Sequence, residues 1–350
     1  MRVVVTGATG NAGTSVLRAL GEAPEVESIL GLARRRPAAD FAKTTFATAD
    51  VAGDDLAPHF RGADAVVHLA WLIQPSRDLR ITRRANVDGS RRVFRAVDEA
   101  GVPALVYASS VGAYSPGPKD RRVDESWPTD GIASSFYSRQ KSEVERLLDR
   151  FEQESPGTRT VRLRPGLIFK GAAGSGVRRL FAGPLVPTSL LRPSLIPVVP
   201  DTEGLRFQAV HSLDVAKAYA LAVTGSAHGA FNVAAEPVLD PPELGRLLGA
   251  RPVPVPPAAL RGAAKLSWKA RLQPTPPGWV DMALGVPLMD TGRARRELGW
   301  EPRHTGGEAL LELIEGMRAS EGVETPPLSP RTGGPLRIRE FLTGVGRASR

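Results

Sequence analysis

The first thirteen residues constrain the fold of this chain more than any other stretch. A run of three valines, Val3 to Val5, is typical of a strand that is buried on both faces of a sheet. Three glycines, Gly7, Gly10 and Gly13, follow the valines, and a helical pattern of apolar residues comes next. This order predicts a strand, a tight turn and a helix, which together open a doubly wound α/β sheet.

Each glycine of the turn has a separate role. Gly7 permits the turn, Gly10 lets the backbone approach a phosphate group, and Gly13 lets the helix lie close to the strand. The N–H groups and the positive dipole end of the helix then face an anion. We therefore expect a dinucleotide site here rather than a turn without a ligand. Its expected contacts are Thr6, Gly7, Thr9, Gly10, Asn11, Ala12 and Gly13.

Composition limits the classes to which the chain can belong. The 350 residues, 42% of them hydrophobic, suffice for one large core and a smaller lobe. The sequence shows neither an apolar run of about 18 residues nor a signal-peptide pattern, so we expect a cytoplasmic protein outside the membrane. There is no cysteine, and the five histidines lack the spacing of metal ligands, so we expect no metal site.

The net charge of +9 is typical of proteins that bind nucleic acids. However, the arginines are spread along the whole chain, without interleaved aromatic residues and without a nucleic-acid-binding module. We therefore expect no nucleic-acid partner. Small anionic molecules account for the positive charge equally well.

The end of the second expected strand, Ile29 to Leu32, indicates the type of dinucleotide. An acidic residue at this place would bind the ribose hydroxyls of NAD, but the chain has Ala33 followed by Arg34 and Arg35. Arginine matches a 2′-phosphate in charge and geometry. NADP(H) is therefore favoured, while NAD(H) remains possible. The alternative for the arginines is a solvated loop.

Three further residues have the side chains of an acid–base site. Ser110 follows an expected strand, Val102 to Ala108, at the end where open α/β sheets bind ligands. Tyr137 comes 27 residues later, and Lys141 lies one turn further along the same helix face. A lysine cation lowers the pKa of a nearby tyrosine, and a serine hydroxyl polarises a substrate oxygen.

The G-x-x-G-x-x-G spacing, Ser110 and the Tyr137-x-x-x-Lys141 pair resemble the extended short-chain dehydrogenases/reductases, the NAD-dependent epimerase/dehydratase family. The resemblance covers roughly residues 1–320. It implies a doubly wound parallel Rossmann sheet over residues 1–170. It also implies a smaller substrate lobe over residues 171–320, interleaved with late sheet elements. Residues 321–350 are expected to form a flexible, basic tail rich in proline and glycine.

The same resemblance implies further contacts with the cofactor. The adenine would lie beside Asp50 and Val51, and Lys141 would hold the nicotinamide ribose. Pro165 would shape a loop over the nicotinamide. Asn86 lies in a long helix that the sequence pattern predicts from Arg77 to Ala100, and it would help to fix the geometry of the active site. The remaining contacts are Leu69, Ala70, Trp71, Ala108 and Tyr137. Family members often form homodimers through two helices, here residues 77–100 and 137–153.

The implied function is that of an NAD(P)-dependent oxidoreductase that acts on a carbonyl or a secondary alcohol. Tyr137 would exchange the proton, Lys141 would assist it, and Ser110 would bind the substrate oxygen. Val111, Gly112 and Ala113 stand where dehydratases have an acidic pair, which disfavours dehydration of a sugar. A (nucleotide-)sugar epimerase is the first alternative, although Phe207 replaces an arginine of such enzymes. The second alternative is a non-catalytic sensor of NADP(H).

Overall fold

The computed structural model of the chain describes residues 1–73, 77–177 and 196–328. Residues 178–195 of the expected substrate lobe and residues 329–350 of the expected tail lie outside the described residues.

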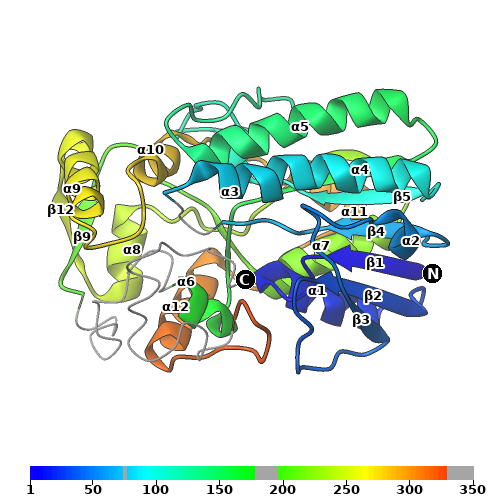
Figure 1. The fold of residues 1–350 in the computed structure, drawn as a ribbon. Coiled ribbons are helices and arrows are strands. Elements are labelled where there is room, and N and C mark those ends of the chain that lie inside the picture. Colours follow the sequence, from blue (N-terminus) through cyan, green and yellow to red (C-terminus); the bar gives the residue numbers. More distant parts are fainter. Residues whose placement is uncertain (74–76, 178–195, 329–350) are drawn as a thin grey trace.

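Seven parallel strands form the central sheet (Figure 1). They are β1 (Arg2–Thr6), β2 (Ser28–Ala33), β3 (Thr44–Thr48), β4 (Ala65–His68), β5 (Ala104–Ala108), β7 (Arg159–Pro165) and β11 (Gly229–Val233). Their order is β11-β7-β5-β4-β1-β2-β3, so the chain reverses direction across the sheet between β1 and β4. This topology confirms the doubly wound Rossmann sheet, in which ligands bind outside the carboxyl ends of the strands at the switch point.

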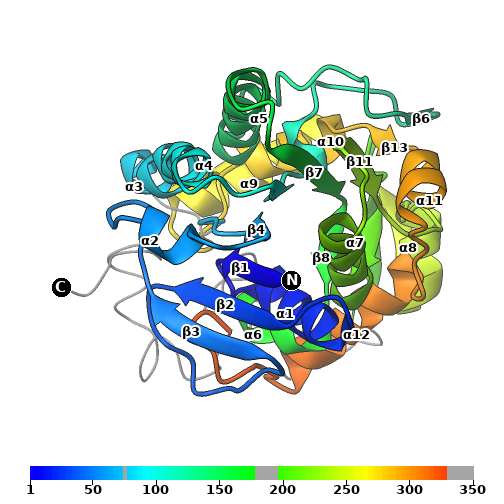
Figure 2. The same ribbon diagram turned by 90° about the vertical axis from the view of Figure 1, so that its right-hand side faces the viewer.

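Helices cover both faces of the sheet, as Figure 2 shows. The main ones are α1 (Asn11–Glu22), α2 (Ala57–Phe60), α4 (Gly89–Glu99), α5 (Phe136–Glu154), α7 (Ser212–Thr224) and α11 (Gly292–Leu298). Val3 and Val5 of β1 pack with residues of α1 and α7, whereas Val4 packs with residues of α4 and α5. All three valines are completely buried, which is why the strand has no polar residue at alternate positions.

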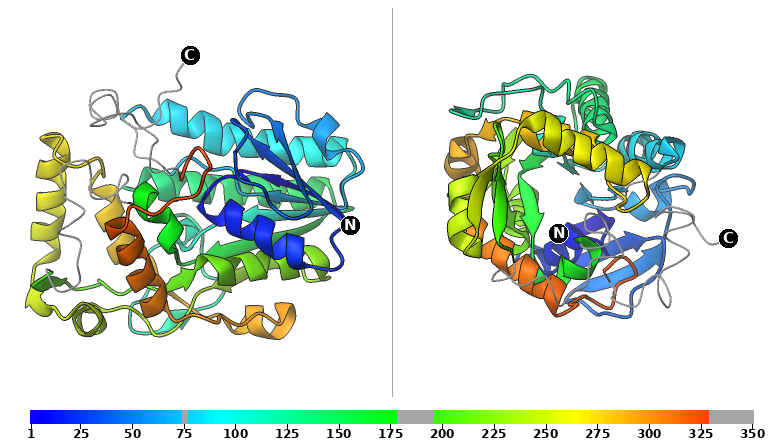
Figure 3. Two further views of the ribbon diagram at one scale, coloured as in Figure 1. Left: turned by 90° about the horizontal axis from the view of Figure 1, so that it is seen from below. Right: turned by 90° about the vertical axis from the view of Figure 1, so that its left-hand side faces the viewer.

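A second, smaller lobe contributes its own apolar cluster around Leu239, Leu244 and Ile314 (Figure 3). Its helices are α6 (Gly174–Val177), α8 (Pro241–Leu248), α9 (Pro257–Lys269), α10 (Gly278–Gly285) and α12 (Gly306–Arg318). Three two-stranded sheets pair β8 (Leu167–Phe169) with β10 (Ala209–His211), β9 (Val198–Asp201) with β12 (Arg251–Pro254), and β6 (Arg122–Val123) with β13 (Leu288–Met289). Among the described helices, none is both long and apolar enough to span a membrane.

The expected single helix from Arg77 to Ala100 is wrong in its middle. The structure has α3 (Leu79–Arg83), then a π-helical turn (Arg84–Asp88), and then α4. Asn86 lies in the π-helical turn, where its side-chain amide bonds to both backbone groups of Leu72 at 2.6 and 3.0 Å. The wider turn and this buried amide join the helix to the loop after β4, a combination often found at functional sites.

Two further expectations need correction. Pro165 is the last residue of β7 and is buried in the sheet, so it does not shape a loop. The start of the expected flexible tail is packed against the sheet domain: Thr325 is fully buried and donates a hydrogen bond to the carbonyl of Thr9 at 2.9 Å. The carbonyl of Glu324 also accepts a bond from the backbone of Ala38 at 3.3 Å.

The contact between α1 and the glycine-rich turn leaves no room for a side chain at Gly13. A Cβ atom there would lie 2.4 Å from the carbonyl oxygen of Gly7 and 2.6 Å from that of Ala8. We expect Gly13→Ala to lower the free energy of unfolding by about 2 kcal/mol or more, because backbone atoms must move apart. Urea denaturation measures this change.

Gly53→Ala is the matched control, since a Cβ atom at Gly53 meets nothing within 4 Å. Its free energy of unfolding should stay within about 0.5 kcal/mol of the wild-type value. Equal stability of the Gly13→Ala variant and the control would contradict the tight packing of α1 on the turn.

Candidate active site

The candidate site lies at the carboxyl ends of β1, β4 and β5. The glycine-rich turn follows β1, the loop with Trp71 follows β4, and Ser110 follows β5. The first half of α5 brings Tyr137 and Lys141 to the same edge. The structure therefore places the three expected catalytic residues and the glycine-rich turn at one edge of the sheet.

The turn itself has the shape of an anion site. Gly7 has a φ of +69°, and a Cβ atom on it would lie 2.6 Å from the backbone nitrogen of Ala70. Gly10 is the N-cap of α1 and offers no side-chain cap, and the first turn of α1 has no acidic residue. The N–H groups of the first turn are thus available for the phosphates of a dinucleotide.

Thr6 lies beneath the turn and has a structural role. It is fully buried, and its hydroxyl bonds to Nδ1 of His68 at 2.7 Å. The other ring nitrogen of His68 bonds to Ser90 at 2.9 Å, and burial followed by the nearby Lys141 lowers the pKa of His68 to about 3. His68 is therefore neutral.

Ser110 and Tyr137 are the expected substrate-binding hydroxyl and the expected acid–base residue. Ser110 is buried, and its hydroxyl oxygen accepts a hydrogen bond from the backbone of Gly112 at 3.0 Å. Burial raises the pKa of Tyr137 to about 12, and a hydrogen bond with Ser110 opposes that rise. The expectation that lysine lowers the pKa of this tyrosine is wrong for this arrangement, because burial dominates. Tyr137 is a protonated acid at neutral pH.

Lys141 is almost fully buried. Its ammonium group donates to the carbonyl of Ala108 at 2.6 Å and lies 3.6 Å from the ring centre of Trp71. The centre of the Tyr137 ring is 6.0 Å away. Burial lowers the pKa of Lys141 to about 7, although Glu145 opposes this change.

Aromatic side chains enclose the ring of Tyr137. Trp71 lies 5.9 Å from it, edge to face, and Trp279 of α10 lies 5.1 Å away on a tilted plane. The Nε1 atom of Trp71 is buried without a hydrogen-bond partner among the described residues, which is a free donor beside the site. Sequence reasoning missed Trp279, because nothing in its local pattern points to the distant helix α5.

Asn86 holds the loop with Trp71 against α5. Besides its bonds to Leu72, its side chain donates to Gln140 at 2.8 Å, one residue before Lys141. Gln140 in turn donates to Thr82 of α3 at 3.0 Å. Asn86 therefore connects the loop after β4 to helix α5. Its expected role in fixing the geometry of the active site stays a prediction.

The remaining expected contacts line the edge of the sheet. Arg34 and Arg35 follow β2 directly and are exposed. Asp50 accepts a bond from the backbone of Ala52 at 3.0 Å, which is a turn role, and Val51 is buried next to Gly89. Leu69 and Ala70 continue from β4 towards the glycine-rich turn.

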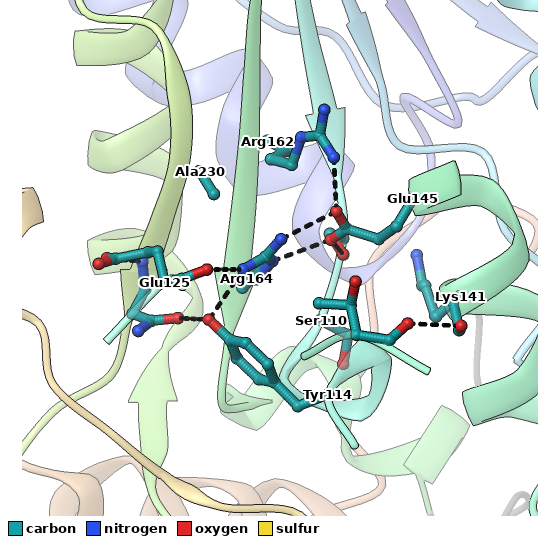
Figure 4. A network of polar contacts seen from close by, with 12 residues as sticks. Ser110, Tyr114, Glu125, Lys141, Glu145, Arg162, Arg164 and Ala230 are labelled. Atoms are coloured by element: carbon teal, nitrogen blue, oxygen red, sulfur yellow. Dashed lines mark hydrogen bonds and ion pairs between the residues drawn. The ribbon is translucent and has the colours of Figure 1, made fainter. Parts of the chain in front are cut away.

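A buried ionic network lies directly behind the catalytic residues (Figure 4). Glu145 of α5 bonds to Ser109, to Arg162 and to Arg164, and the two arginines are alternate residues of β7. Arg164 also bonds to the hydroxyl of Tyr114 at 3.0 Å. Sequence reasoning missed this network, although a glutamate four residues after Lys141 on the same helix face was a readable signal.

Among the described residues, His211, Asp214 and His304 place potential metal-ligand atoms within 4.8 Å of one another. Protein contacts already use these atoms. Nδ1 of His211 accepts a bond from the backbone of Leu213 at 3.3 Å, and Asp214 accepts two bonds from His304 at 3.0 Å. The cluster joins α7 to the chain before α12, and the expectation of no metal site stays a prediction.

Comparisons with known proteins agree with the fold. The family model described as the NAD dependent epimerase/dehydratase family matches residues 3–234. An uncharacterized protein of Mycobacterium tuberculosis is 26% identical over 365 residues, which span 99% of this chain and 90% of that protein. The sterol-4-alpha-carboxylate 3-dehydrogenase (decarboxylating) of Saccharomyces cerevisiae is 33% identical over 121 residues, 35% of this chain and 33% of that enzyme.

A solved structure shares the fold over most of the chain. The Thermus thermophilus UDP-glucose 4-epimerase, in complex with NAD, superposes with a TM-score of 0.67 at 24% identity. The superposition covers 91% of this chain and 100% of that one. Since the family match runs through the whole central sheet to the end of β11, the chain belongs to the NAD-dependent epimerase/dehydratase family, as the resemblance of its motifs predicts.

Proposed function

We propose that this family member is an oxidoreductase that reduces a carbonyl group, or oxidises a secondary alcohol, with a nicotinamide cofactor. One observation carries the proposal: Ser110, Tyr137 and Lys141 meet at the carboxyl edge of the sheet. Gly112, which donates to Ser110, packs against the ring of Tyr137, and Lys141 lies one helical turn further along α5. A protein that only sensed NADP(H) would need no such acid–base set, so the non-catalytic alternative is less well supported.

The chemistry of the site follows from the protonation of Tyr137. Hydride transfer is the chemistry that a bound nicotinamide supplies. Tyr137 is protonated at neutral pH, so it donates a proton to the carbonyl oxygen of the substrate. The Ser110 hydroxyl donates a second hydrogen bond to the same oxygen and stabilises its developing charge. In the opposite direction, Tyr137 would first have to lose its own proton, and the resulting phenolate would accept the proton of the alcohol.

The roles of the cofactor-binding residues are part of this proposal. The N–H groups of the first turn of α1 bind the phosphates, and Lys141 binds the nicotinamide ribose. Arg34 and Arg35 bind the 2′-phosphate of NADP(H), which the absence of an acidic residue at Ala33 also favours. NAD is the alternative cofactor, because solved structures that share this fold are complexes with NAD.

A sugar epimerase is the second candidate function. It is favoured by the superposition on a UDP-glucose 4-epimerase along most of the chain. Epimerisation also uses a tyrosine acid–base residue, so the site geometry suits both reactions.

We further propose a cytoplasmic homodimer, with α3, α4 and α5 at the interface, and a substrate lobe over residues 171–320.

Removal of the Tyr137 hydroxyl tests the catalytic assignment. We expect Tyr137→Phe to lower the rate of NADPH-dependent reduction of a carbonyl substrate by about 100-fold or more, while NADPH affinity stays nearly unchanged. A panel of ketones and aldehydes, followed at the absorbance of NADPH, gives the rate, and calorimetric titration gives the affinity.

Tyr219→Phe is the matched control, since Tyr219 is buried in the core beside α1. It should keep the wild-type rate within about threefold. Full activity of the Tyr137→Phe variant would remove the proposed acid–base role. Turnover of UDP-sugars without net NADPH oxidation would favour the epimerase.

The preference for NADP(H) rests on the arginines after β2. We expect wild-type protein to bind NADPH at least about tenfold more tightly than NADH, a difference of about 1.4 kcal/mol. Arg34→Ala should lose this preference, because the 2′-phosphate loses a cationic partner. Calorimetric titrations with both cofactors measure the ratio.

Arg36→Ala, two residues further along and equally exposed, serves as the control. Equal affinity of the wild type for NADH and NADPH would contradict the preference and would strengthen the case for epimerisation with NAD.

A further inference from the structure

A buried glutamate lies one helical turn beyond Lys141, and the proposed chemistry does not use it. Glu145 is completely buried on α5, four residues after Lys141 and eight after Tyr137. Residues at this spacing share one face of a helix. The face that points at the sheet therefore presents a proton donor, a cation and an anion in sequence.

The carboxylate of Glu145 is bound on both oxygens. One oxygen accepts bonds from Ser109 and from Nε of Arg164 at 2.9 Å. The other accepts bonds from Arg162 at 2.8 Å and from Nη2 of Arg164 at 3.0 Å. Burial alone would raise the pKa of Glu145, but the guanidinium groups of Arg164 and Arg162, with Ser109, hold it at about 2. Glu145 is therefore charged at neutral pH.

The charges of the network do not cancel among themselves. Arg162 also bonds to Asp149 and to Glu152, each at 2.6 Å. Two arginines and three carboxylates leave one net negative charge, and Glu145 is the carboxylate that lies one helical turn from Lys141. Protonated Lys141 makes the whole cluster neutral, which favours its charged form inside the protein.

The groups that face Lys141 come from three elements besides α5. Tyr107 of β5 and Trp71 after β4 present ring faces at 5.2 and 3.6 Å, and His68 of β4 is uncharged. Arg162 and Arg164 of β7 are held by Glu145. On α5 itself, Tyr137 is protonated and uncharged, so the negative charge that opposes the loss of a proton from Lys141 comes from Glu145.

We propose that Glu145 is a positioning residue that keeps Lys141 protonated and aimed at the cofactor side of the sheet. The negative charge of Glu145 acts on Lys141. The hydrogen bond from Ser109 to Glu145 also connects the end of β5 to α5 next to Ser110. The link to catalysis rests on the proposed role of Lys141 in binding the nicotinamide ribose. The electrostatic part stands on the contacts alone.

The titration of Lys141 tests this inference without any substrate or cofactor. The sequence contains seven lysines, so carbon-13 labelling of lysine side chains gives few NMR signals, and Lys141→Arg identifies the signal of Lys141. We expect a wild-type midpoint at about 7. In Glu145→Gln the midpoint should fall by about one pH unit or more, because the neutral amide leaves the two arginines to repel the ammonium group.

Glu152→Gln is the matched control. Glu152 bonds to the same Arg162, but its side chain is 34% exposed and it lies two helical turns further along α5. Its removal should leave the midpoint of Lys141 within about 0.3 pH units of the wild-type value. Glu145→Asp, which keeps the charge, should stay closer to the wild type than Glu145→Gln.

An unchanged Lys141 midpoint in folded Glu145→Gln would overturn the proposal, and so would an equal shift in Glu152→Gln. If Glu145→Gln fails to fold, Glu145→Asp takes its place: its shorter side chain withdraws the carboxylate from Lys141, so a smaller downward shift is expected, and an unchanged midpoint would overturn the proposal.

Binding of NADPH at about pH 5 and about pH 7 then separates the two parts of the proposal. Glu145→Gln should lose more affinity at about pH 7 than at about pH 5, because Lys141 is protonated in both proteins at the lower pH, whereas at the higher pH it is mostly neutral in the variant and still about half protonated in the wild type. A shifted midpoint with unaltered NADPH affinity would overturn the step from Lys141 to the cofactor, and it would leave the electrostatic step standing.

Discussion

The burial of β1 on both faces is the constraint on which the rest of the structure depends. Val3 and Val5 pack against the helices on one face of the sheet, and Val4 packs against the helices on the other face. The strand can therefore lie only near the centre of the sheet. A central first strand forces the next two strands to one side and all later strands to the other. The switch point, the glycine-rich turn and the end of β5 therefore meet at one edge, where the catalytic side chains lie.

A consequence of this location is that the expected catalytic side chains, Tyr137 and Lys141, are shielded from water. Burial favours the neutral forms of both Tyr137 and Lys141. The two effects have opposite consequences for the proposed reaction. A neutral tyrosine is the acid that carbonyl reduction needs, whereas a neutral lysine is a weaker partner for a ribose and for a phenolate. The buried carboxylate of Glu145 corrects only the second effect, because it lies on the lysine side of the tyrosine.

Local patterns predicted the sheet, the glycine-rich turn and the Ser110, Tyr137 and Lys141 set, because each depends on residues that are neighbours in sequence or lie on one helix face. They did not predict Trp279, since its contact with Tyr137 joins segments more than a hundred residues apart. The π-helical turn at Asn86 was missed because an amide inside a helical pattern gives no sign of its tertiary partner. Helix α9 was missed because no residue of it is buried, so its apolar side chains form no stripe. The sequence pattern of Thr305 and Glu308 is that of a capping box and could have predicted the start of α12, but the sequence analysis did not use it.

The bond between Thr325 and Thr9 joins two segments that are 316 residues apart in the sequence. One belongs to the family pattern, and the other lies beyond residue 234, where that pattern ends. Because the acceptor is the backbone carbonyl of Thr9, the bond depends on the hydroxyl group at position 325 and not on the side chain at position 9. A chimera that exchanges only the region up to residue 234 would therefore keep this acceptor, and its donor would come from the other parent.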